Sequence, residues 1–123
     1  MMTGVVNADL EPRMVLSVRA AGAHPHTVEV VIDTGFNGFL TLPPALITAL
    51  GLQWLCRQQG QLADGSVLAF DVYVATVDWE GQPWAVEVEA ADAQPLLGMA
   101  LLQGSELRML VLSGGPVTIS PVP

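Results

Sequence analysis

The amino-acid sequence predicts a mainly β fold, a small closed or partly closed β-barrel with one or two short helices. Three observations support this prediction: the stretches of strand character are short, turn signals containing Gly, Pro or Asp separate them regularly, and few stretches are helical. The 123 residues, 51% of them hydrophobic and 13% charged, suffice to bury a core. We therefore expect one domain over residues 1–123.

The N-terminal half contains several strand signals and the clearest helix signal. Strands are expected over Gly4–Asn7, Met14–Ala20, Thr27–Ile32 and Leu40–Leu42. The turn-rich stretch AGAHPH separates the second strand from the third, which predicts a hairpin. Pro43 and Pro44 suit the first turn of a helix over ALITAL, and Gly51 is well placed to end it.

The C-terminal half repeats this pattern of short strands and tight turns. Strand signals at Gly60–Leu62 and Val67–Trp79 flank the turn Ala63–Ser66, and EGQP is the next turn. Residues 84–90 alternate, with valines on one face and Glu87 and Glu89 on the other. The stretch LLGMALLQG is long enough for about two helical turns, and strands are expected over Leu107–Leu112 and Val117–Ser120, joined by an SGGP turn.

Composition excludes several classes of function. Four arginines and no lysine stand against twelve acidic residues, a formal charge of −8, which argues against a nucleic-acid partner. The apolar runs are far shorter than the ~18 residues that cross a bilayer, and the N-terminus lacks a signal-peptide pattern. We expect a soluble, cytoplasmic protein without a membrane partner. The low charge fraction suggests that oligomer contacts cover some apolar surface.

The strongest candidate for chemistry is Asp33-Thr34-Gly35, which follows the apolar run Val30–Ile32. Asp and Gly are ordinary turn residues, so the tripeptide could be only a turn after a strand. A carboxylate at the edge of a core is costly to desolvate unless it is held, however. Glycines at 35 and 38 allow close backbone approach, so that amide N–H groups can point at the Asp33 carboxylate.

Other constellations are weaker. His24-Pro25-His26 lacks the further ligands that a metal site needs, and Cys56 is the only cysteine, so no metal and no cofactor is expected. Ser66 and Ser113 have no plausible His partner for a nucleophilic triad.

The stretches DTGFNGFLTLP, ADGS and LLGMALL together resemble the clan AA aspartic proteases, and among them a small prokaryotic group of single-domain, retropepsin-like members. The resemblance covers the chain from about residue 13 to residue 119. It implies a retropepsin-like acid-protease barrel with a single lobe per chain. It also implies that the strand through Leu96, Leu97 and Gly98 passes behind the catalytic loop and supports it, and that QLADGSV forms a flap over the substrate.

The resemblance further implies roles for single residues. Asp33 would be catalytic, Thr34 would hydrogen-bond to the partner's loop across a dimer axis, and Gly35 would leave room for the substrate backbone. Phe36 replaces a small residue usual in retropepsins, so it would reshape the cleft, and Met99-Ala100 replaces a polar pair. The flap residues Ala63, Asp64, Gly65 and Ser66 would contact the substrate.

Hydrolysis of this type needs two carboxyl groups that share a proton, and the chain is too short for a second lobe. The hypothesis is therefore a homodimeric aspartic endopeptidase, in which the two Asp33 carboxylates activate a water against a peptide or protein substrate. The alternative is a non-catalytic dimeric module of the same fold that binds peptides or acts as an adaptor.

Overall fold

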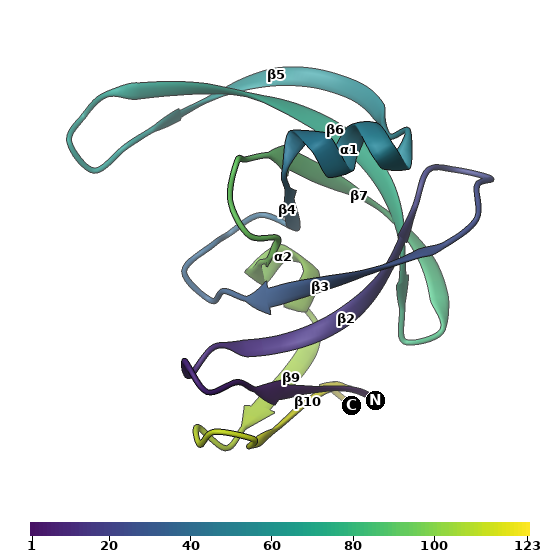
Figure 1. Cartoon of the computed structure of the whole chain (residues 1–123), viewed down its shortest axis with the longest axis vertical. Helices are drawn as coiled ribbons and strands as arrows, with labels where there is room; N and C mark the ends of the chain where they lie inside the picture. Colours follow the sequence, from purple (N-terminus) through teal and green to yellow (C-terminus); the bar gives the residue numbers. More distant parts are fainter.

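The computed structural model describes residues 1–123 and contains ten strands and two helices (Figure 1). The strands are Met2–Val6 (β1), Pro12–Arg19 (β2), His26–Ile32 (β3), Leu40–Leu42 (β4), Gln53–Gln61 (β5), Val67–Trp79 (β6), Gln82–Ala90 (β7), Leu96–Leu97 (β8), Ser105–Met109 (β9) and Pro116–Pro121 (β10). The helices are Pro44–Leu50 (α1) and Met99–Leu102 (α2). Neither helix is long and apolar enough to cross a membrane.

All ten strands join one sheet, in the order β5-β6-β7-β4-β8-β3-β2-β1-β10-β9. An additional antiparallel pairing of β6 with β2, through Val18 opposite Val77, bends the sheet round on itself. The strands β2, β6, β7, β4, β8 and β3 thus form a closed ring, which confirms the predicted mainly β barrel.

The hydrophobic core fills this ring. Each of its six strands contributes a side chain that is 0% exposed: Val18, Val30, Leu40, Val77, Val88 and Leu97. The period-2 alternation of a strand places these residues inward and their neighbours outward. A further sheet segment, β1 with β10 and β9, extends the ring and buries Val6, Val117 and Ile119 against it.

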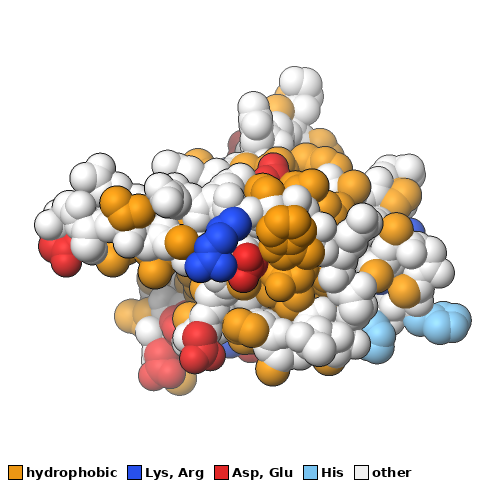
Figure 2. Space-filling model, turned by 90° about the horizontal axis from the view of Figure 1, so that it is seen from above, with side chains coloured by type: hydrophobic (Ala, Val, Ile, Leu, Met, Phe, Trp, Pro, Cys, Tyr) orange, Lys and Arg blue, Asp and Glu red, His pale blue; other side chains and the backbone are white.

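A helix covers one side of this core, and a hairpin projects from the barrel. Helix α1 covers one side through Ile47 and Leu50, with Pro44 in its first turn and Gly51 in the left-handed conformation at its C-terminus, as expected. The β5–β6 hairpin extends beyond the barrel as a long arm (Figure 1). Seen from above, hydrophobic side chains with few charges among them gather beside the base of this arm (Figure 2).

Four expectations are corrected by the structure. Strand β5 begins at Gln53, although only Gly60–Leu62 was expected, because an arm exposed on both faces shows no apolar alternation. Helix α2 is one turn of four residues, since Leu96 and Leu97 extend as β8. Strand β9 covers residues 105–109 and stops before Leu110–Leu112, which lie exposed outside any strand.

The fourth correction concerns the turn at EGQP. Glu80 and Gly81 alone connect β6 to β7, both with positive φ, and Trp79 already pairs with Gln82. A two-residue turn of this kind matches the twist of the flanking strands.

Candidate active site

The loop that carries Asp33 begins where β3 leaves the barrel wall. The Asp33 amide donates to the Leu97 carbonyl at 2.9 Å, so the backbone of this residue is tied to β8. The carboxylate Oδ1 accepts the Gly35 amide at 2.9 Å, and the Asp33 carbonyl accepts the Phe36 amide at 3.2 Å. The Asp33 side chain is half-buried, while Thr34 and Gly35 are exposed. The turn therefore presents one carboxylate at the surface of the core.

Strand β8 lies directly behind this loop. It pairs in parallel with β3, through Ile32 opposite Leu97, and antiparallel with β4, through Leu40 opposite Leu97. The short strand thus fills the gap between the two strands that the loop connects, as the resemblance implies. Buried Thr41 strengthens this arrangement, because its Oγ1 accepts the Leu96 amide at 3.0 Å.

The first turn of α2 supports the loop from beneath. The amides of Gly98, Met99 and Ala100 donate to the carbonyls of Phe39, Phe36 and Gly38, at 3.0, 2.8 and 3.1 Å. Three consecutive backbone hydrogen bonds hold the loop carbonyls in place without any side chain. The polar pair that Met99-Ala100 replaces is therefore not needed for these bonds.

Two glycines make this close approach possible. A Cβ on Gly98 would lie 2.3 Å from the Gly38 carbonyl oxygen and 2.5 Å from Phe36 Cδ2. A Cβ on Gly38 would lie 2.5 Å from Phe36 Cζ. The half-buried Phe36 ring therefore rests on both glycines, and the large residue at 36 is accommodated because position 38 has no side chain.

Glu89 is a neighbour of the loop that the sequence did not reveal. It lies on β7 opposite Thr41 of β4, and its Oε2 lies 2.5 Å from where a Cβ of Gly38 would stand. The Glu89 carboxylate has no hydrogen-bond or ion-pair partner. Its pKa is raised, mainly because the group is partly buried and secondly because of the negative charge of Glu87. The alternation of the sequence predicted Glu87 and Glu89 on the same face of the strand, but the Asp33 loop covers only Glu89.

The residues of the predicted flap form the tip of the β5–β6 hairpin. Asp64 Oδ1 accepts the Ser66 amide at 2.9 Å and the Ser66 hydroxyl at 2.6 Å, and Gly65 adopts a φ of +86°. These hydrogen bonds lower the pKa of Asp64, with the hydroxyl as the largest contribution. The tip with Ala63–Ser66 lies apart from the Asp33 loop, and no hydrogen bond joins the two (Figure 1).

Comparison with known proteins identifies the fold. No protein-family model and no curated protein sequence matches the chain. Among solved structures, EIAV protease complexed with the inhibitor HBY-793 matches with a TM-score of 0.59 and 20% sequence identity. The match covers 79% of this chain and 89% of that one. The chain has a retropepsin-like fold.

Within this retropepsin-like fold, an open cavity of about 500 Å³ adjoins the Asp33 loop. Thr34 and Asn37 border it on the side of the loop, and residues of α2 and β9, among them Met99 and Leu107, line the rest. Thr34, the residue expected at a dimer axis, therefore faces an unfilled apolar space.

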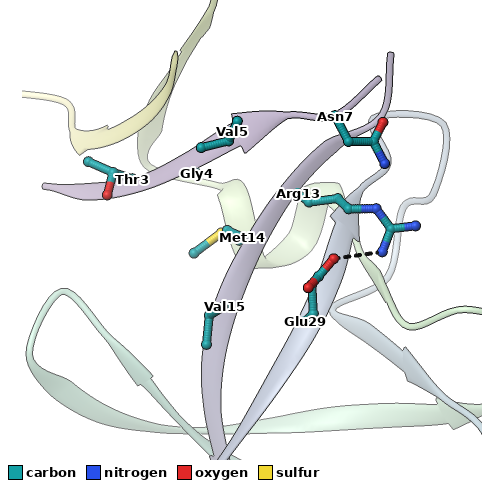
Figure 3. A pocket seen from close by; sticks show the side chains of 8 residues that line it. All are labelled: Thr3, Gly4, Val5, Asn7, Arg13, Met14, Val15 and Glu29. Atoms are coloured by element: carbon teal, nitrogen blue, oxygen red, sulfur yellow. Dashed lines mark hydrogen bonds and ion pairs between the residues drawn. The ribbon is translucent and has the colours of Figure 1, made fainter. Parts of the chain in front are cut away.

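A second cavity, of about 430 Å³, lies across β1 and β2, and Asp33 is not among the residues that line it (Figure 3). Arg13 is the cation within it, but its terminal nitrogens already donate to Glu29 and Glu11 at 2.9 Å and also to Gln94. This guanidinium links three segments of the chain: its terminal nitrogens are occupied, and only the buried Nε has no partner. The cavity therefore offers no free cation for a ligand.

The remaining candidates are not brought together. His24 and His26 lie exposed in and after the β2–β3 loop, and no group of three His, Cys, Asp or Glu side chains could hold a metal ion. The rings of Trp79 and Trp84 pack edge to face, with their centroids 6.3 Å apart, and both side chains pack against the core.

Proposed function

We propose that this chain is a homodimeric aspartic endopeptidase, in which Asp33 of each subunit supplies one of two catalytic carboxyl groups. The observation that carries the proposal is the Asp33-Thr34-Gly35 turn, which presents a carboxylate at the surface on a loop braced by β8 and α2 within a retropepsin-like fold. EIAV protease, a protein of similar fold, was solved in complex with an inhibitor.

The chemistry requires two copies because a single carboxyl group cannot be ionised and protonated at once. The ionised Asp33 takes a proton from a water, whose oxygen attacks the peptide carbonyl carbon, while the protonated Asp33 donates its proton to the carbonyl oxygen. The tetrahedral intermediate then collapses: the protonated carboxyl group gives its proton to the amide nitrogen, the C–N bond breaks, and the other carboxylate takes a hydroxyl proton from the intermediate, which restores one proton to the pair. Two carboxyl groups held close together do not both ionise, because their negative charges would repel each other. One proton therefore stays on the pair.

The other Asp-Gly sequence of the chain, Asp64-Gly65, cannot provide the second group within one chain. It stands at the hairpin tip, where Ser66 occupies the carboxylate. In the proposed dimer, each hairpin closes over the substrate, and Ala63–Ser66 contact the substrate backbone. Thr34 meets the partner's loop on the axis, and Phe36, whose ring packs on Gly38 and Gly98, reshapes the cleft through the loop that it supports.

The test is cleavage of a library of unfolded peptides between pH 3 and pH 8, with products identified by mass spectrometry. Asp33→Asn should lower the rate by at least ~10³-fold, within the range that acid–base groups supply. The matched control is Asp78→Asn, an isosteric change at an exposed aspartate of β6, which should leave the rate unchanged. Sedimentation should show the same dimer for all three proteins.

Cleavage that persists undiminished in Asp33→Asn would refute the proposal. Binding of peptides by the unsubstituted protein without turnover at any of these pH values would instead support a non-catalytic peptide-binding module on the same fold.

A further inference from the structure

Strand β9 is an open edge of the sheet. It stands last in the strand order and pairs only with β10. The Leu110 amide donates to the Pro116 carbonyl, and the Gly104 carbonyl accepts the Val122 amide, so the even-numbered residues of this segment hydrogen-bond to β10. The amides and carbonyls of Ser105, Leu107 and Met109 consequently point away from the molecule. Native proteins usually cover or block such an edge.

Apolar surface accompanies this edge. Leu107 lines the cavity beside Thr34, and Met99 on the same cavity is 45% exposed. Immediately after β9, residues Leu110–Leu112 are 58–65% exposed. A monomer therefore leaves an apolar cavity, an exposed apolar segment and a row of unpaired backbone groups next to one another.

The charges on β9 are self-complementary. Glu106 and Arg108 are exposed on the outer face, on either side of Leu107, and form an ion pair with each other within the chain, with Arg108 Nε 3.5 Å from Glu106 Oε1. A two-fold axis perpendicular to the sheet pairs residues of the same face, so the register is centred on one residue. Centres at residue 106, 107 or 108 leave most of β9 paired with itself. Centring on Glu106 or Arg108 places like charges opposite each other. Centring on Leu107 places Glu106 opposite Arg108 of the second copy, twice.

This register also satisfies the backbone. With Leu107 opposite itself, Ser105 lies opposite Met109 of the second copy, so that all three outward-facing residues meet outward-facing residues. Registers centred on residue 106 or 108 also pair outward-facing residues, but they pair only two of these three within β9. The charges therefore select the register, and the backbone is compatible with it.

We infer that a second copy of the chain docks on β9, antiparallel and centred on Leu107, and joins the two sheets across the two-fold axis. The inference rests on the proposed function, whose dimer it specifies: it identifies the surface, the register and the charge pairs. The partner would cover the cavity that Thr34 borders, and the axis that passes through Leu107 would bring the two Asp33 loops toward each other.

Charge reversal tests the register in solution. E106R and R108E each place two pairs of like charges across the interface and should raise the dimer dissociation constant about ten- to hundredfold in sedimentation equilibrium. The double variant E106R/R108E restores opposite charges at both pairs and should return to within about threefold of the unsubstituted protein. The matched control D78R carries the same charge change as E106R on β6 and should dimerise normally.

Cross-linking tests the same register without reversing a charge. In a C56S background, E106C mixed with R108C should form an oxidised covalent dimer. Opposite residues of this non-hydrogen-bonded pair have Cα atoms ~4.5 Å apart, within the span of a disulfide. E106C alone should form little covalent dimer, because position 106 lies opposite 108.

The outcomes separate this inference from the proposed function. If both single reversals dimerise like the unsubstituted protein, or if E106C alone cross-links as well as the mixture, the β9 interface is wrong, although cleavage can persist. If the charge series behaves as expected and no peptide is cleaved, the interface stands and the protease assignment fails. A protein that stays monomeric at every concentration refutes both.

Discussion

The Asp33 loop and the tip of the β5–β6 hairpin are held in opposite ways. Three consecutive amides, at residues 98–100, donate into the loop, and neither Gly38 nor Gly98 has room for a methyl group. The hairpin tip is held only by its own turn, and a Cβ added to Gly65 would meet no atom within 4 Å. The proposed function accounts for this difference: a carboxylate that meets its counterpart in a dimer needs a fixed backbone, whereas a flap over a substrate needs freedom to move.

The largest expected effect comes from one methyl group added to the fixed region. Gly98→Ala places a Cβ 2.3 Å from a backbone oxygen, which cannot move without displacing the loop, and should cost about 3 kcal/mol of unfolding free energy. Urea denaturation measures this cost, and peptide cleavage should fall at least tenfold.

The matched change in the arm is Gly60→Ala. Its Cβ would meet only the tip of the Phe70 ring, at 3.3 Å, which can rotate away. We expect a change of less than about 0.5 kcal/mol. Equal destabilisation by the two variants would contradict the proposed difference in rigidity.

The next effect concerns the brace behind the loop. Thr41→Val removes the acceptor of the Leu96 amide and should cost about 1–2 kcal/mol, because that amide is left without a partner. Thr41→Ser keeps the hydroxyl and should recover most of this loss in the same urea titration. A valine variant as stable as the serine variant would show that the hydrogen bond contributes little.

A smaller effect is expected at the tip. Asp64→Ala removes both hydrogen bonds to Ser66 and should leave the melting temperature unchanged, while KM rises on the order of threefold, as for one lost hydrogen bond. The lowered pKa of Asp64 sets how the stability of the turn depends on pH. The ionised carboxylate stabilises the turn above the ordinary pKa of 3.8, and the turn loosens as pH falls through the lowered pKa.

Hydrogen exchange of the tip amides would follow this loosening, with Asp78→Ala as the control on the same strand. A lowered melting temperature in Asp64→Ala would instead place the tip within the cooperative core.

The smallest effect is electrostatic and lies beside the loop. The raised pKa of Glu89 means that the folded state holds its proton more tightly, so the stability of the protein falls as pH rises from 4.5 through the raised pKa. Glu89→Gln should remove this dependence and stabilise the protein at pH 7 by no more than about 0.5 kcal/mol, since much of the group is solvated.

Thermal melts of the unsubstituted protein and of Glu89→Gln at pH 4 and pH 7 measure how the stabilisation depends on pH. Asp92→Asn, at an exposed carboxylate outside the loop and the β9 edge, is the control. If Glu89→Gln raises the melting temperature as much at pH 4 as at pH 7, the effect does not come from titration of Glu89.

Local sequence determined much of this protein. Leu40–Leu42 and Val67–Trp79 form strands with the predicted bounds, since alternation and flanking turns are local signals. Gly51 ends α1 because a glycine adopts the left-handed conformation at little cost. The Asp33 turn was recognisable because Asp, Thr and Gly are adjacent, and the resemblance of three short stretches predicted the retropepsin-like fold.

Only the tertiary structure decided which distant residues meet. Glu87 and Glu89 look alike in the sequence, yet the Phe36–Gly38 loop covers one and leaves the other in solvent. Strand β5 carries a local signal only at its end, from Gly60, and its pairing with β6 alone holds the rest extended. The open edge at β9 likewise depends on the order of ten strands. Periodicity reports which face of a strand is buried, whereas partners across the sheet follow from how the whole chain closes.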